Sequence, residues 1–386
     1  MPTAPEIASL LQVDGPFVSA YLPSPSKEPN AAFHLTTRWK TMRSTLASAG
    51  ADDDTLVAVD LAVGVDSAAV RPEPAGAADN HPGVEVDAAG DHAGGDVLAI
   101  VAAGGRVLLR AHLPVVRGAG RARFGLVPWL TPLLDATEGE VPYVLVVADR
   151  AGADLHGYGL DGETDSSVDG SHNQIERNKP GGFAQKRYQQ RAIDSWERNA
   201  AEVAAKVSEL AERLSARLVL IGGDDHAVVP LVNALGHPWS ERVEVLEHAT
   251  RAAGGDLATL DDEVSRLVRT VRAEDEVAVL QRFREENGRH DRAADGPARV
   301  IESLQAAMVD TLLVHDDEDD DRSAWFGPEP NHLGLNVADL EAMGVTQPQQ
   351  ARLVDVAVRA ALGTGAAVRL VPAATVRDGL GAILRA

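Results

Sequence analysis

The residues best suited to chemistry lie between positions 177 and 191, where basic side chains gather and no acidic one occurs. The five basic residues are Arg177, Lys179, Lys186, Arg187 and Arg191. The chain as a whole is strongly acidic, with a formal net charge of -22 over 386 residues. A local reversal of charge indicates an anionic target, and phosphate is the group that Lys and Arg clusters contact in nucleic acids. We call residues 177–191 the basic tip.

A glycine pair and a glutamine stand at the centre of the basic tip. Gly181 and Gly182 permit backbone angles and a close approach that a Cβ atom forbids. Backbone N–H groups at such a place can hold a developing oxyanion or orient a water molecule. Gln185 is neutral and cannot act as a strong base at pH 7, so its role would be to position water or to order the loop. The plain alternative is a loop that precedes a helix.

The residues after the glycines are predicted to begin a helix. Lys186, Arg187 and Arg191 then lie near a helix N-terminus, where phosphate is already favoured by unpaired N–H groups. Tyr188 could stack on a base, or it could be a core residue. Arg187 and Arg191 are like charges four residues apart, which destabilises an isolated helix slightly. That cost argues against a purely structural role for the two arginines.

Other charged residues give weaker signals. Two acidic runs, at residues 52–54 and 316–321, are interpreted as solvated loops, with a magnesium site or a docking patch for a basic partner as the alternatives. His226, His237 and His248 do not have a recognisable metal-ligand spacing, and the chain has no cysteine. The sequence therefore predicts no metal site and no cofactor.

Composition limits the class of protein. A hydrophobic content of 45% and a mean hydropathy of -0.12 are typical of a globular protein, and the length predicts two or three domains. The N-terminus has no secretory signal, and no apolar run approaches the roughly 20 residues that a membrane span needs. We therefore expect a cytoplasmic protein with no membrane partner.

The first segment, residues 1–138, is predicted to be an α/β domain. Residues 33–46 are predicted to form a helix and the apolar run 55–63 a strand. Pro, Gly, Ala and Asp make residues 71–96 a predicted loop. Two apolar runs within residues 96–110 flank a Gly-Gly pair, which predicts a tight hairpin.

The middle segment, residues 139–252, carries the basic tip. It opens with a buried strand at residues 142–149, a turn and a partner strand at residues 153–159. A polar loop at residues 161–180 leads to the basic tip. Two more strands are predicted at residues 217–223 and 241–247. A mixed sheet is the expected result.

A long helix follows the basic tip in the middle segment. Its apolar residues recur with spacings of three and four, which is the pattern of a helix packed on a sheet. The residues of this stripe are Ile193, Trp196, Ala200, Val203, Val207, Leu210 and Leu214.

The last segment, residues 256–386, alternates helix and strand. Helices are predicted at residues 261–286, 298–308 and 349–362, and strands at residues 310–315, 367–371 and 379–385. This alternation predicts an α/β/α sandwich.

The ordered set of motifs resembles the archaeo-eukaryotic peptide-release factor and Pelota superfamily, in its bacterial branch. Four features carry the resemblance, and they span residues 141–386. They are the hairpin at residues 144–155, the segment 180–191 that leads into the long helix, Val309-Asp-Thr-Leu-Leu-Val314, and Asp378-Gly-Leu-Gly-Ala-Ile-Leu-Arg385. The resemblance implies three α/β domains in a release-factor or Pelota-like arrangement.

The resemblance also implies a function at the ribosome. Members of this class resemble tRNA in outline and bind the ribosomal A site, and the release factors carry Gly-Gly-Gln at the tip that enters the peptidyl-transferase centre of the 23S rRNA. Here Phe183 and Ala184 separate Gly182 from Gln185, so the pattern is Gly-x-x-Gln. That spacing is similar to the variant in peptidyl-tRNA hydrolases that clear stalled large subunits.

Two functions stay open. The altered spacing and the acidic body favour a Balon-like ribosome hibernation factor without catalysis, for which the resemblance implies elongation factor Tu as a partner. The retained Gln185 and its basic surroundings favour a peptidyl-tRNA hydrolase, with Gly181, Gly182 and Gln185 as its catalytic residues. In both cases Arg177, Lys179, Lys186, Arg187, Tyr188 and Arg191 are the expected RNA-binding residues.

Overall fold

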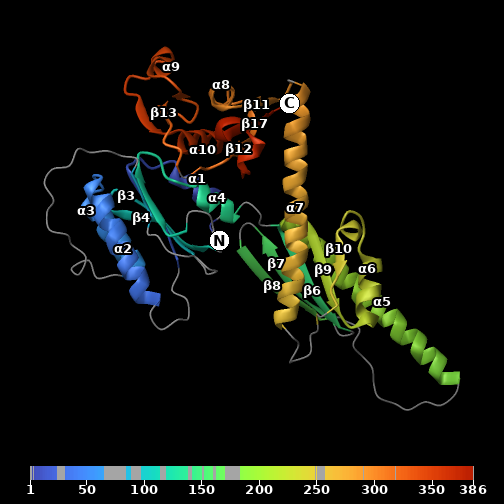
Figure 1. Ribbon diagram of the computed structural model, residues 1–386. Coiled ribbons are helices and arrows are strands. Elements are labelled where there is room, and N and C mark those ends of the chain that lie inside the picture. Colours follow the sequence, from blue (N-terminus) through green and yellow to red (C-terminus); the bar gives the residue numbers. More distant parts are fainter. Residues whose placement is uncertain are drawn as a thin grey trace. The chain divides into compact units, whose positions relative to one another are not determined.

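The computed structural model places most of the chain (Figure 1). It describes residues 2, 4–23, 31–64, 84–87, 97–113, 119–137, 141–149, 152–159, 162–169, 183–247, 249, 257–289, 291–317 and 319–385. The side chains of residues 183–196 are not among those described. The chain folds into two compact units, one that combines Met1–Gly139 with Ala278–Ala386 and one formed by Glu140–Val277. The division into domains at residues 1–138, 139–252 and 256–386 stays a prediction.

The N-terminal part of the first unit is built on an antiparallel sheet with the strand order β2-β5-β1-β3-β4. Its strands are β1 (Phe17–Pro23), β2 (Val84–Asp87), β3 (Val97–Ala103), β4 (Arg106–Leu113) and β5 (Arg121–Gly125). Its helices are α1 (Ala4–Leu10), α2 (Ala31–Ser48), α3 (Asp53–Val63) and α4 (Thr131–Thr137). The predicted hairpin is confirmed: β3 and β4 meet at Gly104 and Gly105, which both have positive φ.

The prediction of a strand at residues 55–63 is wrong, because this run is helix α3. Its N-cap, Asp52, accepts a hydrogen bond from the backbone N–H of Thr55 at 2.7 Å, and Gly64 ends it in the left-handed conformation. Leu56, Val59 and Asp60 are buried at helical spacing. A run rich in Val, Leu and Ala fits both the two-residue period of a strand and the 3.6-residue period of a helix. The capping residues at both ends favour the helix.

The predicted loop at residues 71–96 is also wrong in part. Residues 84–87 form β2, which pairs antiparallel with β5 at the edge of the sheet. The short Val-Glu-Val-Asp alternation is a strand pattern. Loop-forming residues surround it and concealed it in the sequence.

The second unit is a five-stranded mixed sheet with the order β10-β9-β6-β7-β8. Its strands are β6 (Tyr143–Asp149), β7 (Gly152–Gly159), β8 (Gly162–Asp169), β9 (Leu218–Gly223) and β10 (Val243–Val245). Its helices are α5 (Phe183–Arg213), α6 (Asp225–Ala234) and a 3-10 turn at Trp239–Glu241. α5 and α6 share one apolar core with β6, β7 and β9, as the helical stripe predicts.

The predicted polar loop at residues 161–180 contains a strand, so this prediction is wrong for β8. β8 pairs antiparallel with β7 along its full length, and Oδ1 of Asp165 lies 2.7 Å from Nδ1 of His156 on the facing strand. Its sequence, Gly-Glu-Thr-Asp-Ser-Ser-Val-Asp, has almost no apolar alternation. The strand forms because its backbone pairs with the backbone of β7. The periodicity of apolar residues in the sequence does not reveal such pairing.

The C-terminal part of the first unit has two sheets. The larger has the order β11-β17-β12-β16, and the smaller has the order β14-β13-β15. Its strands are β11 (Ala293–Asp295), β12 (Val309–Val314), β13 (Ser323–Phe326), β14 (Leu333–Gly334), β15 (Gln349–Arg352), β16 (Ala367–Leu370) and β17 (Leu380–Leu384). Its helices are α8 (Pro297–Gln305), α9 (Val337–Ala342), α10 (Leu353–Gly363) and 3-10 turns at Ala373–Thr375 and Arg377–Gly379.

Helix α7 (Leu257–Arg289) contributes to a core in each unit. Phe283 packs with Leu313 of β12 and Ile383 of β17 on one face of the larger C-terminal sheet, whereas Leu312 and Val314 point to the other face with α8 and α10. The predicted α/β/α sandwich is therefore confirmed. The mixed α/β fold class is confirmed for the whole chain.

The predicted helix at residues 349–362 begins later than expected. Residues 349–352 form β15, which pairs with β13, and α10 starts at Leu353. Gln-Gln-Ala-Arg consists of good helix formers, so local propensity favours a helix. The ladder with β13 overrides that propensity.

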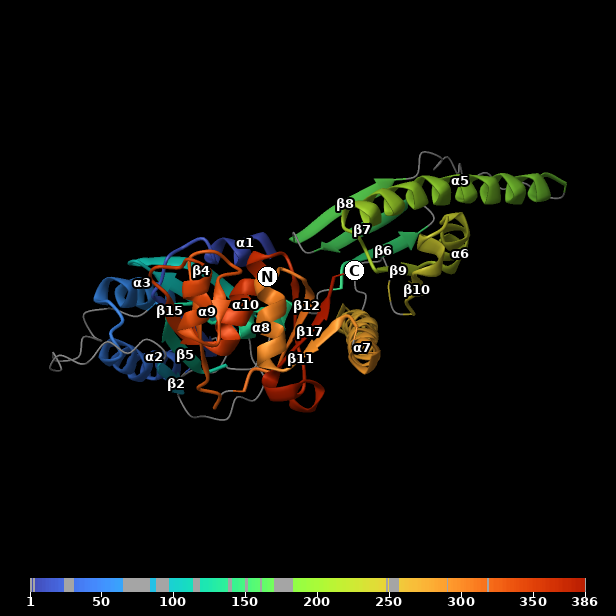
Figure 2. The same ribbon diagram turned by 90° about the horizontal axis from the view of Figure 1, so that it is seen from above.

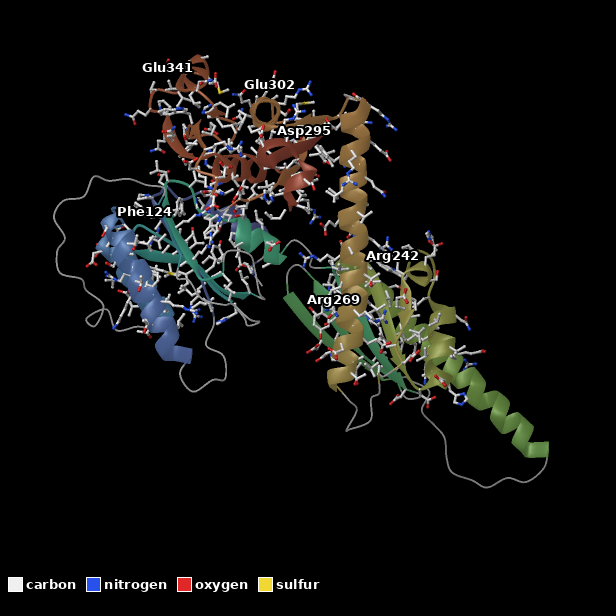
Figure 3. The ribbon with its side chains drawn as sticks, in the orientation of Figure 1. Phe124, Arg242, Arg269, Asp295, Glu302 and Glu341 are labelled. Atoms are coloured by element: carbon white, nitrogen blue, oxygen red, sulfur yellow. The ribbon has the colours of Figure 1, made fainter. Side chains whose placement is uncertain are left out.

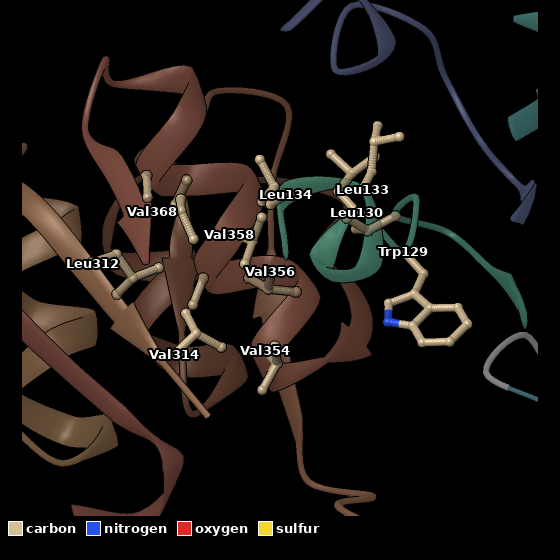
Figure 4. Close-up of a cluster of buried hydrophobic side chains, with 14 of the residues drawn as sticks. Trp129, Leu130, Leu133, Leu134, Leu312, Val314, Val354, Val356, Val358 and Val368 are labelled. Atoms are coloured by element: carbon tan, nitrogen blue, oxygen red, sulfur yellow. The ribbon is translucent and has the colours of Figure 1, made fainter. Parts of the chain in front are cut away.

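One apolar core joins the N-terminal and C-terminal parts of the first unit. Leu130, Leu133 and Leu134 at helix α4 lie beside Val356 and Val358 of α10 (Figure 4). All five side chains are buried, each at most 8% exposed. Segments more than 200 residues apart in the sequence therefore share a core.

Candidate functional site

Helix α5 begins at Phe183, directly after the glycine pair. Gln185, Lys186, Arg187, Tyr188 and Arg191 therefore all lie within its first nine residues, and their backbone is described but their side chains are not. Arg177, Lys179, Gly181 and Gly182 lie outside the described residues. The structure places five of the nine predicted site residues on one helix end, and their roles stay predictions.

The start of α5 determines what the backbone offers at this place. The first four N–H groups of a helix have no partner within the helix, and here they belong to residues 183–186. The helix dipole adds partial positive charge at the same end. The basic tip contributes five formal positive charges, two before the helix start in sequence and three after it. The local arrangement suits an anion such as a phosphate group.

The two halves of α5 have different surroundings. Its second half packs on the sheet of the second unit through Ala200, Val203, Val207 and Leu210, which are at most 7% exposed. Its first half extends past the edge of that sheet in both views (Figures 1 and 2). The helix therefore carries residues 183–191, the C-terminal part of the basic tip, away from the core that anchors it. Ile193 and Trp196, predicted for the same stripe, have side chains outside the described set.

A glycine in β7 allows the anchored half of α5 to lie close to the sheet. A Cβ atom at Gly157 would be 2.6 Å from Cδ1 of Leu214 and 3.1 Å from Cδ1 of Leu210. Leu214, the last residue of the predicted stripe, is partly buried just after the helix ends. The absence of a side chain at Gly157 makes room for the leucines.

Asp149, the last residue of β6, and Gly152, the first residue of β7, lie near α5. The carboxylate of Asp149 accepts a hydrogen bond from the backbone N–H of Gly152 at 2.9 Å. Asp149, Gly152 and the buried Asn199 of α5 line a small cavity of about 20 Å³. That volume has room for about one water molecule and for no substrate.

The opposite face of the sheet is covered by the first half of α7. Leu260 and Val264 pack there against Leu145 of β6 and Leu220 of β9. Arg217 forms a two-fold hydrogen-bonded ion pair with Asp275, with N–O distances of 2.7 and 2.8 Å. Arg242 and Arg269, labelled in Figure 3, lie at the surface of this unit.

The acidic run at residues 316–321 differs from the predicted solvated loop at its first residue. Asp316 is only 12% exposed, and its Oδ1 lies 2.6 Å from Nη2 of Arg352. Its Oδ2 accepts hydrogen bonds from Nε1 of Trp129, at 3.1 Å, and from the hydroxyl of Thr131. Sequence reasoning missed this network because Trp129 and Thr131 lie 187 and 185 residues from Asp316, and no local pattern links them.

Burial alone would raise the pKa of Asp316. The guanidinium groups of Arg352 and Arg123 and the hydrogen bonds from Thr131 and Trp129 outweigh that effect, so its pKa lies below the usual value. The carboxylate is therefore charged at neutral pH and holds the two parts of the first unit together. Arg123 itself lies over the ring of Trp129, at 4.1 Å from the centroid.

Within the described residues, no group of three or more His, Cys, Asp or Glu side chains could hold a metal ion. Over the same residues, no helix combines the length and the apolar character that crossing a membrane requires.

Comparison with known proteins found a family match for the part of the chain that carries the basic tip. Residues 142–289 match the model of bacterial archaeo-eukaryotic release factor family 2. The uncharacterized protein Rv2629 of Mycobacterium tuberculosis (strain ATCC 25618 / H37Rv) is 26% identical over 385 residues, which cover 97% of this chain and 95% of the relative.

Two solved structures are similar to the chain at low identity. Pelota of Archaeoglobus fulgidus has a TM-score of 0.32 at 16% identity, with 75% of this chain and 79% of that chain covered. The archaeal translation termination factor aRF1 has a TM-score of 0.27 at 16% identity, with 100% and 99% covered. The family match confirms the predicted resemblance to the bacterial branch of the archaeo-eukaryotic release factor superfamily over residues 142–289.

Proposed function

We propose that this protein is a ribosome-binding translation factor that occupies the A site and directs its basic tip toward the peptidyl-transferase centre. The observation that carries the proposal is the family match over residues 142–289, because that segment contains the basic tip, α5 and the sheet that anchors it. Members of this superfamily bind the A site with the corresponding domain. The expected contact is with the 23S rRNA.

The charge of the chain supports a contact that is local. A formal net charge of -22 opposes binding of RNA over the whole surface, and screening limits that opposition to about 10 Å at physiological salt. Helix α5 extends past its sheet (Figure 1) and so carries Lys186, Arg187 and Arg191 away from the core of its own unit. Lys186, Arg187 and Arg191 on α5 would contact phosphates, and Tyr188 would stack on a base.

The role that we propose at the A site is ribosome hibernation or protection without catalysis. The tip has no contiguous Gly-Gly-Gln, because two residues separate Gly182 from Gln185. Elongation factor Tu is the proposed delivery partner, and the cytoplasm is the proposed compartment. Neither a metal nor a cofactor is needed for such a binding role.

Rescue of stalled ribosomes by peptidyl-tRNA hydrolysis is the second candidate. One observation favours it: Gln185 lies in the first turn of α5, three residues after Gly182, so it keeps the Gly-x-x-Gln spacing at a helix start. Backbone N–H groups at Gly181 and Gly182 would stabilise the oxyanion formed when water attacks the ester of peptidyl-tRNA. Gln185 would orient that water molecule.

The test adds full-length protein to idle ribosomes and to ribosomes that carry peptidyl-tRNA, and measures co-sedimentation and peptide release. For a hibernation factor, the wild type and Gln185→Ala both co-sediment with idle ribosomes and release no peptide. For a hydrolase, the wild type releases peptide and Gln185→Ala binds but loses release by about 100-fold or more. Failure of the wild type to bind either kind of ribosome would overturn both candidates.

A pair of matched variants separates the effect of the basic tip on ribosome binding from the effect of a change in net charge. Lys186→Gln/Arg187→Gln/Arg191→Gln removes three positive charges from the tip. The control Arg266→Gln/Arg284→Gln/Arg289→Gln removes three from exposed positions of α7. The proposal predicts weaker ribosome binding for the tip variant only. Equal weakening of both would indicate a general charge effect.

A further inference from the structure

The short strand β15 is an edge strand with an unused side. It pairs only with β13 in the three-stranded sheet, and no other described strand lies beside it. In an antiparallel pair, alternate residues direct their N–H and C=O groups toward the partner strand and the others direct them away. A row of outward-facing backbone groups on an edge strand can pair with another extended chain.

Two cavities are lined in part by β15, and we call them together the groove. Their volumes are about 550 and 400 Å³. Gln349 lines the first cavity, and Gln350, Ala351 and Arg352 line the second. Leu126 and Val127 line both cavities, so the two share a wall. The groove therefore lies between β15 and the segment that follows β5.

The first cavity is largely neutral. Its lining combines apolar side chains, among them Val127 and Val345, with the amides of Gln12, Gln347 and Gln349. Its charged lining residues are Asp14 and Arg359. Arg359 donates to the backbone oxygens of Gly327, Pro328 and Glu329, and the guanidinium is therefore occupied by the wall of the cavity. This end suits small, uncharged side chains.

The second cavity is acidic. Four carboxylates line it, those of Asp319, Asp320, Asp321 and Asp355, against the guanidinium groups of Arg123 and Arg352. Arg352 is already paired with Asp316, and Asp320 is paired with Arg322 at 2.6 Å. Asp319 and Asp321 are exposed, and no described cation forms an ion pair with either. These two carboxylates are available to a positively charged partner.

We propose that this groove binds an extended peptide segment of another protein, which adds a strand to the open edge of β15. Main-chain hydrogen bonds to β15 would supply affinity, and side chains on alternate residues would enter the two cavities. A Lys or Arg of the peptide lies at the Asp319 and Asp321 end, and a small, uncharged residue lies at the Gln349 end. The acidic lining disfavours nucleic acid as the occupant.

The length of the strand limits the segment. Four residues of β15 span about 13 Å at about 3.3 Å per residue, so about four residues of the peptide pair with it. This site uses no residue of the basic tip. The acidic run at residues 316–321 thereby gains the docking role that was one of its alternatives.

The experiment selects ligands with a random dodecapeptide library displayed on phage and immobilised full-length protein. Selected peptides are then synthesised, and their affinity is measured by fluorescence anisotropy. We expect a basic residue and an extended, alternating pattern in the selected sequences. Asp319→Asn/Asp321→Asn should weaken binding on the order of tenfold. The control Asp261→Asn/Asp262→Asn removes two exposed carboxylates from α7 and should leave affinity unchanged.

Backbone methylation tests strand addition directly. Two versions of a selected peptide carry N-methyl groups on its odd-numbered or its even-numbered residues. Only one set of N–H groups faces β15, so one version should lose binding by 100-fold or more and the other should keep most of it. The proposal fails if no peptide is enriched over a blank surface, if both methylated versions bind equally, or if the Asp319/Asp321 variant binds as well as the wild type.

Discussion

The indole of Trp129 donates a hydrogen bond through Nε1 to Oδ2 of Asp316, across 3.1 Å. Trp129 follows the N-terminal sheet, and Asp316 follows β12 of the C-terminal part. The same carboxylate is paired with Arg352. A single buried charge therefore satisfies donors from both parts of the first unit.

The first prediction is that Asp316→Ala destabilises the first unit by about 3–5 kcal/mol. The substitution leaves the guanidinium of Arg352 largely buried without its closest counter-ion, which is the costly half of a broken buried pair. Urea denaturation followed by tryptophan fluorescence measures the loss. Asp262→Ala, at an exposed position of α7, is the control and should change stability by less than about 0.5 kcal/mol. Equal stability of Asp316→Ala and the control would show that the network contributes nothing.

The second prediction concerns acid. Because the pKa of Asp316 is lowered on folding, the unfolded chain binds more protons in the interval below the usual pKa of an aspartate. The stabilisation is therefore complete above pH 5 or so and is lost as the pH falls through the folded pKa. Asp316→Asn should flatten the dependence of unfolding free energy on pH in this acid range. A parallel dependence in wild type and variant would contradict the assignment.

The third prediction is that Gly223→Ala destabilises the second unit by at least about 3 kcal/mol. Gly223 has φ of +133°, and a Cβ atom there would lie on the backbone oxygen of Ala148. Gly236→Ala is the matched control, because a Cβ atom at Gly236 meets nothing within 4 Å. Thermal unfolding of the two variants compares them. Equal thermal stability of Gly223→Ala and Gly236→Ala would contradict the close approach of Gly223 in β9 to Ala148 in β6.

The fourth prediction concerns the buried pair in the N-terminal part. Asp60 is fully buried, and its carboxylate accepts hydrogen bonds from Nε of Arg43, at 2.9 Å, and Nε1 of Trp39, at 2.6 Å. Asp60→Asn removes the charge and should cost about 3 kcal/mol or more. Asp54→Asn, at an exposed position of the same helix, should cost less than about 1 kcal/mol. Urea denaturation separates the two outcomes.

The fifth prediction is the salt dependence of ribosome binding, if the basic tip contacts phosphates. Removing three positive charges with Lys186→Gln/Arg187→Gln/Arg191→Gln should reduce the slope of log affinity against log salt by about 2, at roughly 0.7 per charge. Affinity is measured by sedimentation between low and moderate salt. An unchanged slope would remove the basic tip from the RNA contact.

The sequence by itself determined the elements whose signals are local. The stripe with spacings of three and four placed the second half of α5 on its sheet, because one face of a helix must be buried. The Gly104-Gly105 pair determined a hairpin, since glycine adopts the positive φ that the turn requires. The basic tip was also visible, because charge reversal needs no knowledge of the fold.

The tertiary structure decided the features that depend on distant partners. Residues 349–352 became a strand and polar residues 162–169 became β8 because neighbouring strands offered their backbone hydrogen bonds. Residues 55–63 became a helix because the Asp52 cap and the position of its buried side chains favour it. Asp316, the first residue of its acidic run, belongs to a buried network because Trp129 and Arg352 lie beside it only in the folded chain.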